Sequence, residues 1–367
     1  MKRKPTGKAA NPMRARDEKL LQKLAVYLNF HADAVTEADV RALADEFSLT
    51  NAQAFALLLA GALGLDAAEN EEDARTVRED FPRMLHPLDA AAYANDPYAR
   101  ALRAAASREQ SLPDNPTDPA AHSHASRAAL SREDISQTLH PRCAAADAGA
   151  PRESNADGHE DASRTRRSRN TLGRENASQA GAFELGYASY RPYELFVADD
   201  LRAYPDGAVL PVLGYFAQPF AYPVLTENGR EWMTATPNEI NTIRPMAEAA
   251  HGHVLTLGLG LGYFAFHALL NPRVERVTAV ERSADAIRLF RERILPAFPR
   301  PERLTILQAD AFAAAPALYQ SGQYDFVFAD LWHDAADGLP MYERLKHMEV
   351  PGPEYRYWIE KTLEFYR

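Results

Sequence analysis

Three glycines at alternate positions, Gly258, Gly260 and Gly262, follow the apolar run VLTL in the segment VLTLGLGLGYF. Glycine has no side chain, so it lets another group approach the backbone closely, and it adopts positive φ at little cost. A helix that begins after such a turn presents unpaired N–H groups, which attract carboxylate or phosphate groups. The segment therefore predicts a strand, a turn and a helix whose N-terminus faces a polar ligand. Tight packing of the strand against the helix is the structural alternative.

Two carboxylates follow these glycines at informative distances. Glu281 ends the next strand-like run, a little over twenty residues after Gly258, where a carboxylate can accept hydrogen bonds from both hydroxyls of a ribose. Asp310 ends the third run and could accept from an adenine amine, with the Ala311 N–H facing a ring nitrogen; capping of the next helix is its alternative role. Tyr263 stands where the dinucleotide motif GxGxxG needs glycine, so that motif fails. The three strand ends predict a site shaped for adenosine.

A further polar cluster, Asp330, His333, Asp334 and Asp337, follows the fourth strand-like run. Asp330 could take a proton from an amine or hold its charge near a cation, and His333 could act as a base near neutral pH. We take Asp330, His333 and Asp334 as the candidate catalytic residues. A divalent metal on these side chains and simple capping of a turn are the alternatives. We expect no metal, because so short a spacing rarely converges on one ion.

The apolar pattern predicts the elements that position these residues. From residue 254 onward, continuous apolar runs alternate with helical segments, which is typical of a parallel sheet covered on both faces by helices. Such sheets bind ligands beyond the carboxyl ends of their strands, where the strand order reverses. The expected strands are VLTL, VERVTAVE, LTILQAD and YDFVFADL, with helices over 263–270, from Ser283 onward and between the last two strands. After Asp330 we expect only helix.

A β-hairpin and a capped helix are predicted before the glycine segment. Asn228 and Gly229 separate two strand-like runs in AYPVLTENGREWMTAT, and this dipeptide suits a type I′ turn because both central residues take positive φ. Thr236, Pro237 and Glu239 then provide a hydroxyl cap, a proline in the first turn and an acid near the helix start. We expect a helix of about three turns there.

The chain from about residue 181 to 367 resembles the class I S-adenosylmethionine-dependent methyltransferases. LTLGLGLG matches the first motif of that family, VTAVE the second, LQADAF the third and YDFVFADLWHD the fourth. The resemblance implies an α/β, Rossmann-like fold with a mostly parallel sheet flanked by helices, S-adenosylmethionine as methyl donor, Glu281 on the ribose and Asp310 beside the adenine. Within the family the chain is most similar to the spermidine-synthase-like branch, in which a comparable hairpin and capped helix precede the glycine loop.

Three positions depart from the family pattern. The family usually has an acid two residues before the first glycine, where it helps hold the ammonium group of the donor, and this chain has Thr256. Polyamine aminopropyltransferases usually carry an aspartate between the last glycines, where Leu261 stands. The fourth motif of the aminopropyltransferases has two aspartates three residues apart. In this chain Asp330 matches the first aspartate, and His333 stands at the position of the second. The candidate cofactor-binding residues are Thr256, Gly258, Gly260, Gly262, Glu281, Asp310 and Ala311.

The remainder of the chain divides by composition. Leu20, Leu24 and Leu28 recur at a helical spacing, and no aromatic residue occurs between Tyr98 and Phe183. A stretch without such residues cannot offset an ordering entropy of roughly 1–2 kcal/mol per residue. We therefore expect a disordered basic tail (1–16), a small all-helical N-terminal domain (17–103), a disordered linker or insertion (104–180), a β-hairpin with the helix after it (181–253) and a Rossmann-like cofactor-binding domain (254–367).

Composition also bounds the partners. The net charge of −10 repels polyanions and argues against nucleic acid as a partner. No uninterrupted apolar stretch is long enough to cross a bilayer, and the basic start lacks the apolar core of a secretory signal. Cys143 is the only cysteine, so an internal disulfide and a thiolate metal cage are excluded. We expect a cytoplasmic protein without a membrane partner. The sequence does not decide between a monomer and a homo-oligomer.

Methyl transfer to an unidentified small-molecule or protein acceptor is the predicted activity. Aminopropyl transfer to a polyamine is one alternative, which Leu261 disfavours. A non-catalytic nucleoside-binding or scaffolding module is another, favoured by Thr256 and by the short stretch after the fourth strand. A nicotinamide oxidoreductase is disfavoured by Tyr263 and by the lack of a recognisable second domain for a hydride acceptor.

Overall fold

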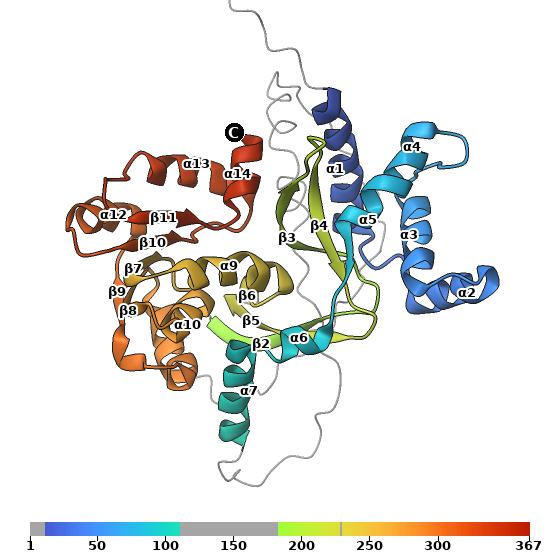
Figure 1. Ribbon diagram of the computed structural model, residues 1–367. Coiled ribbons are helices and arrows are strands. Elements are labelled where there is room, and N and C mark those ends of the chain that lie inside the picture. Colours follow the sequence, from blue (N-terminus) through green and yellow to red (C-terminus); the bar gives the residue numbers. More distant parts are fainter. Residues whose placement is uncertain (1–11, 111–182, 228–229) are drawn as a thin grey trace, which may run out of the picture.

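The computed structural model describes residues 12–110, 183–227 and 230–367 (Figure 1). Most of the expected basic tail, most of the expected linker and the turn dipeptide Asn228-Gly229 lie outside these residues. Helix α1 (Pro12–Phe30) begins within the range expected for the tail, and α7 (Pro97–Gln110) extends into the range expected for the linker. The described residues contain no helix that is both long and apolar enough to cross a membrane.

A five-stranded, all-parallel sheet forms the larger unit, with the order β11-β10-β7-β8-β9. In chain order these strands are β7 (Gly252–Leu257), β8 (Val274–Glu281), β9 (Leu304–Gln308), β10 (Phe326–Ala329) and β11 (Glu354–Tyr357). Counted from the β9 edge, the strands therefore follow the order third, second, first, fourth, fifth. This is the doubly wound arrangement, in which the strand order reverses beside the first strand. The predicted α/β, Rossmann-like fold is confirmed.

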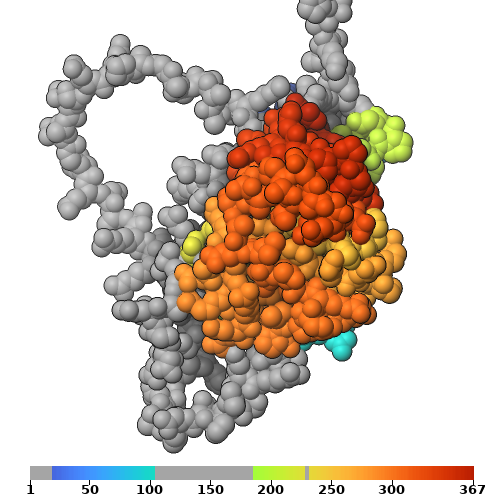
Figure 2. Space-filling model, turned by 90° about the vertical axis from the view of Figure 1, so that its left-hand side faces the viewer, coloured from blue at the N-terminus to red at the C-terminus, as the bar shows by residue number. Residues whose placement is uncertain are grey.

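Helices flank this sheet, with α13 and α14 above it and α10 below it in the view of Figure 1. Figure 2 shows the same unit as a continuous surface coloured yellow to red. The helix predicted over 263–270 is confirmed, and Ser283 caps the next helix as predicted by accepting from the Ala286 N–H. The helices are α9 (Pro237–Ala249), α10 (Tyr263–Leu270), α11 (Ala284–Leu289), α12 (Ala311–Gln320), α13 (Ala335–Lys346) and α14 (Glu360–Tyr366), and α11 continues as a π-helical turn over Phe290–Ile294.

The expectation of helix alone after Asp330 is wrong, because β11 adds a fifth strand at the edge of the sheet. Its sequence, EYRY, is short and half polar, which suits an edge strand and leaves no apolar run to recognise. Tyr357 is buried, and its ring lies edge-on to Tyr342 of α13. The strand is therefore held by aromatic contacts with a helix that precedes it in the chain.

Two smaller sheets connect the N-terminal helices to this unit. The predicted hairpin is confirmed as β5 (Phe220–Glu227) and β6 (Arg230–Thr234), and β2 (Phe183–Tyr190) adds a third antiparallel strand. The second sheet has the order β1-β4-β3, formed by β1 (Leu85–Pro87), β3 (Phe196–Ala203) and β4 (Val209–Tyr215). Apart from the hairpin, the sequence pattern did not predict these strands.

The N-terminal region is helical apart from β1. Capping boxes start two helices, with Thr36 before α2 (Glu37–Phe47) and Thr50 before α3 (Asn51–Ala62). The predicted Leu20, Leu24 and Leu28 stripe of α1 is buried in a cluster that also contains Leu213 of β4. The helices of this region therefore pack on the β4 sheet. The shorter helices are α4 (Glu71–Arg75), α5 (Phe81–Met84) and α6 (Ala90–Ala94), and a π-helical turn covers Thr76–Asp80.

Candidate functional site

The predicted strand ends lie side by side at the carboxyl edge of the sheet. Beyond the ladder, the Gly258 N–H donates to the Val280 carbonyl at 3.0 Å and the Ala309 N–H donates to the Glu281 carbonyl at 3.1 Å. On the other side of β7, the Asp330 N–H donates to the Leu257 carbonyl at 2.9 Å. These bonds hold the glycine loop between the tips of β8 and β10, at the point where the strand order reverses.

All three glycines of the loop have positive φ, namely 96° at Gly258, 51° at Gly260 and 79° at Gly262. The expected close approach to their α-carbons also occurs, but the approaching atoms belong to this chain. A Cβ at Gly258 would overlap the Asp330 carbonyl oxygen, and one at Gly262 would overlap the rings of Phe290 and Phe298. Backbone conformation and internal packing therefore both require glycine at these positions.

Met233 of β6 covers the middle glycine. A Cβ at Gly260 would overlap the Met233 Sδ and Cε atoms, so the thioether lies against the bare α-carbon. The cavity beneath has a volume of about 20 Å³, which is enough for about one water molecule. Pockets that hold ligands of nucleotide size are roughly 300–1,000 Å³. A ligand can therefore reach this part of the loop only if the Met233 side chain moves.

The two predicted nucleoside contacts lie on the neighbouring strands. Glu281 is 9% exposed at the end of β8, and its Oε1 accepts from the Ser283 N–H at 2.8 Å. Asp310 is exposed after β9 and caps α12 by accepting from the Ala313 N–H at 2.9 Å. Ala311 is the buried first residue of that helix. The predicted capping role of Asp310 is confirmed, and the binding roles of all three residues stay predictions.

Two carboxyl groups line the small cavity together with Thr256. Burial raises the pKa of Asp330 to about 7, although nearby His333 lowers it. Burial also raises the pKa of Glu239 to about 8, against hydrogen bonds from Thr236 and Thr234 that lower it. Thr256 is 2% exposed, and its hydroxyl donates to the Gly258 carbonyl at 3.1 Å. The cavity therefore holds acidic groups that keep protons near neutral pH.

The remaining catalytic candidates lie at the start of α13 and outside this cavity. His333 has an exposed side chain whose Nδ1 is 3.3 Å from Asp337 Oδ2. Asp334 caps α13 and accepts from the Ala336 N–H at 2.7 Å, so the capping alternative holds for it. The His333 ring also lies edge-on to Trp232 of β6. Within the described residues, no group of three or more His, Cys, Asp or Glu side chains could hold a metal ion.

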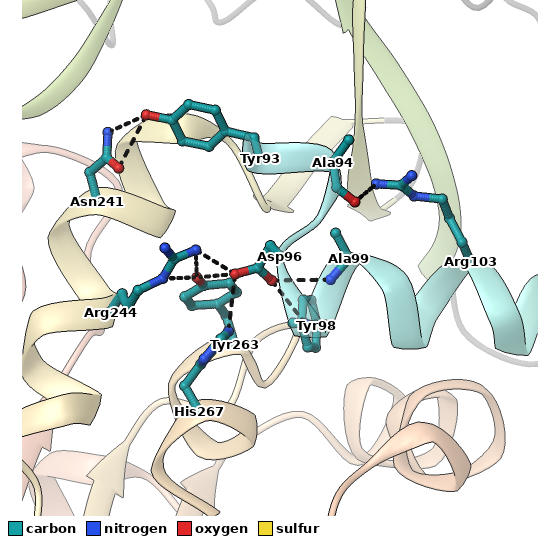
Figure 3. A network of polar contacts seen from close by, with 10 residues as sticks. All are labelled: Tyr93, Ala94, Asp96, Tyr98, Ala99, Arg103, Asn241, Arg244, Tyr263 and His267. Atoms are coloured by element: carbon teal, nitrogen blue, oxygen red, sulfur yellow. Dashed lines mark hydrogen bonds and ion pairs between the residues drawn. The ribbon is translucent and has the colours of Figure 1, made fainter. Parts of the chain in front are cut away.

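A buried carboxylate fixes the helix that follows the glycine loop (Figure 3). Asp96, between α6 and α7, is 2% exposed and forms an ion pair of 2.5 Å with Arg244 of α9. The same oxygen accepts from the Tyr263 hydroxyl at 3.0 Å and lies 3.3 Å from Nε2 of His267, both on α10. Its other oxygen accepts from the N–H groups that start α7. One carboxylate thus joins α7, α9 and α10.

Tyr98 adds a direct contact with the glycine loop. Its hydroxyl donates to the Leu261 carbonyl, and its ring lies edge-on to Tyr263 at a centroid distance of 5.4 Å. Tyr98 is buried in the same core as the sheet. Asp96 and Tyr98 are therefore positioning residues, because they hold the loop without lying in its cavity.

Comparisons with known proteins concern the fold. No protein-family model and no curated protein matches the chain. Among solved structures, a probable spermidine synthase from Corynebacterium glutamicum is 20% identical, with a TM-score of 0.28 over 37% of this chain and 55% of that one. Human methyltransferase-like protein 13 in complex with SAH is 18% identical, with a TM-score of 0.23 over 31% of this chain and 56% of that one.

This chain therefore spans little more than half the length of either structure. The fold assignment rests on the strand order and on the four motifs, which occupy the ends of the first four parallel strands. The resemblance to class I S-adenosylmethionine-dependent methyltransferases holds at the level of this fold.

Three residues of the site were not found from the sequence. Met233 is an ordinary apolar residue of a hairpin strand, and only the contact with Gly260 reveals its position. Glu239 was recognised as a helix-start acid, and its place beside Thr256 depends on how α9 packs. Asp96 gave no signal in the sequence pattern. All three depend on contacts between distant segments.

We expect Asp96→Asn to lower the free energy of unfolding by about 1–3 kcal/mol at pH 7, because Arg244 loses its buried partner. Burial acts to raise the pKa of Asp96, but His267, the Ala99 N–H and Arg244 together lower it to about 2. Because the folded state lowers this pKa, the carboxylate stabilises the fold fully when the pH is above 3.8, the ordinary pKa of the group. This stabilisation is lost as the pH falls toward about 2. Urea unfolding should show that the difference in free energy of unfolding between wild type and Asp96→Asn becomes smaller from pH 7 to pH 2. A difference that does not depend on pH would contradict this role.

We expect Met233→Ala to increase the affinity and the association rate for a ligand of the glycine loop, because the variant removes the side chain that covers Gly260. Stopped-flow binding with S-adenosylhomocysteine measures both quantities. Met348→Ala, which truncates a partly buried methionine after α13, is the matched control and should leave both unchanged. Equal constants in wild type and Met233→Ala would show that Met233 does not lie on the path of the ligand.

Proposed function

We propose that the protein binds S-adenosylmethionine and transfers its methyl group to a small-molecule or protein acceptor. The observation that supports this proposal is the alignment of the Gly258 turn, Glu281 and Asp310 at the tips of three adjacent parallel strands. A carboxylate on the second strand suits ribose hydroxyls, and a polar helix start after the third suits an adenine edge. The spermidine synthase and the SAH-bound methyltransferase share similarity with parts of this chain but do not identify its substrate.

The placement of Glu281 and Asp310 supports binding of the nucleoside end of this cofactor. Glu281 keeps one carboxylate oxygen on the Ser283 N–H, which orients the group, and Asp310 is accessible. The amino-acid end would lie at Gly260 and the small cavity, where methionine side chains are flexible enough to adapt. With Met233 displaced, the donor set on the chain suits a cation, because the carboxyls of Glu239 and Asp330 line the cavity.

The chain contributes placement and proton handling. The bound cofactor would supply an electrophilic methyl group, which requires an in-line approach by the acceptor, and holding that geometry supplies much of the rate. Asp330, with a pKa raised to about 7 by burial, is the best placed carboxyl to accept a proton from a neutral acceptor near pH 7. His333 is exposed beside Trp232 and could contact the acceptor at the rim.

A non-catalytic nucleoside-binding or scaffolding module is the second candidate. The contact between Met233 and Gly260, with a cavity of only about 20 Å³, favours it, because internal packing alone accounts for the glycines. A scaffolding module would not bind S-adenosylmethionine, and a non-catalytic nucleoside-binding module would bind it without transferring the methyl group.

We expect calorimetry to detect binding of S-adenosylmethionine by the wild-type protein and preference for it over its decarboxylated form and NAD. Glu281→Ala should weaken nucleoside binding by about 1–3 kcal/mol, because the ribose loses a charged acceptor at a buried site. Glu281→Gln keeps an acceptor for the Ser283 N–H and should show the same direction. Binding of none of the three compounds would favour the scaffold, and preference for the decarboxylated form would favour aminopropyl transfer.

Glu275→Ala is the matched control, because Glu275 lies on the same strand, β8, is exposed and pairs with His253 far from the carboxyl end. Its affinity should equal that of the wild type. If Glu281→Ala and Glu275→Ala both bind as the wild type does, Glu281 has no place in the site.

A further inference from the structure

Glu239 lies in the first turn of α9, and its side chain lines a cavity. It is partly buried, and it lines the cavity under the glycine loop together with Thr256 and Gly258. Its Oε2 accepts from the Thr236 N–H at 2.9 Å and from the Thr234 hydroxyl at 2.9 Å. Its Oε1 accepts no hydrogen bond from the described residues. The carboxyl group is thus held at one oxygen and lies beside the cavity.

The chemistry of the cavity needs a negative charge at this place. A ligand that carries an amino-acid tail brings an ammonium group, and burying that cation is costly unless an opposite charge such as a carboxylate faces it. Thr256, at the end of β7, offers a hydroxyl that already donates to the Gly258 carbonyl. Of the residues that line the cavity, only Glu239 and Asp330 carry carboxyl groups. The proposed function already assigns Asp330 to proton transfer with the acceptor, which leaves Glu239 for the tail of the ligand.

We propose that Glu239, on α9, is the residue that binds the ammonium group of the ligand's amino-acid tail at the glycine loop, in place of an acid at position 256. This inference rests on the proposed function, since it assigns a role within the same site. Thr234 and Thr236 orient the carboxyl group through its Oε2 atom. Met233 of β6 lines the same cavity and covers Gly260 until a ligand enters.

The electrostatics of the site agree with this role. Burial, with smaller contributions from the nearby acids Asp330 and Glu231, raises the pKa of Glu239 to about 8 in spite of the hydrogen bonds from Thr236 and Thr234 that lower it. An acid in such surroundings lacks a positive partner, and a cation placed beside it favours the ionised form. Arg244 lies one turn further along α9, but its guanidinium is paired with Asp96. Glu239 forms no ion pair within the part of the chain that the structure describes, so a cation beside it would come with the ligand.

The test compares two nucleosides that differ only in this tail. S-Adenosylhomocysteine carries an ammonium and a carboxylate, and methylthioadenosine carries neither. Glu239→Gln removes the charge but keeps an oxygen acceptor for the Thr236 N–H, since glutamine also serves at this position of a helix cap. Glu248→Gln, on the same helix and exposed, is the matched control for the loss of one negative charge.

We expect calorimetry to show that Glu239→Gln weakens S-adenosylhomocysteine binding about tenfold or more and leaves methylthioadenosine within about twofold of the wild type. Glu248→Gln should leave both unchanged. Thermal unfolding should show that Glu239→Gln is folded and at least as stable as the wild type, because a buried acid without a cation is costly.

Three results would overturn the inference. Equal losses for both nucleosides would mean that Glu239 acts by shaping the loop and does not face the tail. Unchanged affinity for S-adenosylhomocysteine would remove Glu239 from the site. Absence of any nucleoside binding by the wild-type protein would overturn the proposed function, and the inference with it.

Discussion

The path of the loop between β7 and α10 is the constraint on which the rest of the site depends. Three residues with positive φ turn the chain, and each lets a different part of the protein reach the backbone. The carbonyl of Asp330 meets Gly258, the thioether of Met233 meets Gly260, and two phenylalanine rings meet Gly262. One loop therefore determines the spacing of β10, of the hairpin strand β6 and of the helical segment after α11. A side chain at any of the three positions would separate these parts.

The pKa values of the buried carboxyl groups near this loop shift in opposite directions, because the groups have different partners. Asp96 is buried among Arg244, His267 and the N–H groups of α7, so its pKa falls to about 2 in spite of burial. Glu239 and Asp330 are also desolvated, and burial raises their pKa values to about 8 and about 7 in spite of hydrogen bonds to Glu239 and of His333 near Asp330. The first arrangement fixes structure, because its charges are already neutralised. The second leaves acids that keep protons near neutral pH and that a cation placed beside them would ionise.

The hairpin connects these two observations to function. Its strand β6 carries Met233 over the glycine loop and Trp232 against both His333 and Arg282. The same strand leads directly into α9, which carries Glu239 and Arg244. Movement of this strand would therefore change the access to the cavity and the surroundings of its acids together. The N-terminal region is linked to the same place through Asp96 and Tyr98, so a segment far away in sequence supports the loop.

Local sequence determined the parts of this protein in which neighbouring residues decide the structure. Apolar runs predicted the first four parallel strands, Ser283 predicted a helix start and Asn228-Gly229 predicted the hairpin, because caps and turns act over a few residues. The four motifs also predicted which strand ends would be neighbours. Edge strand β11 was not predicted, because its four residues are half polar and too few to show a periodic pattern. Only the tertiary structure placed Met233 on Gly260, Glu239 beside Thr256 and Asp96 between three helices, because these contacts join segments separated by many residues and depend on how whole elements pack.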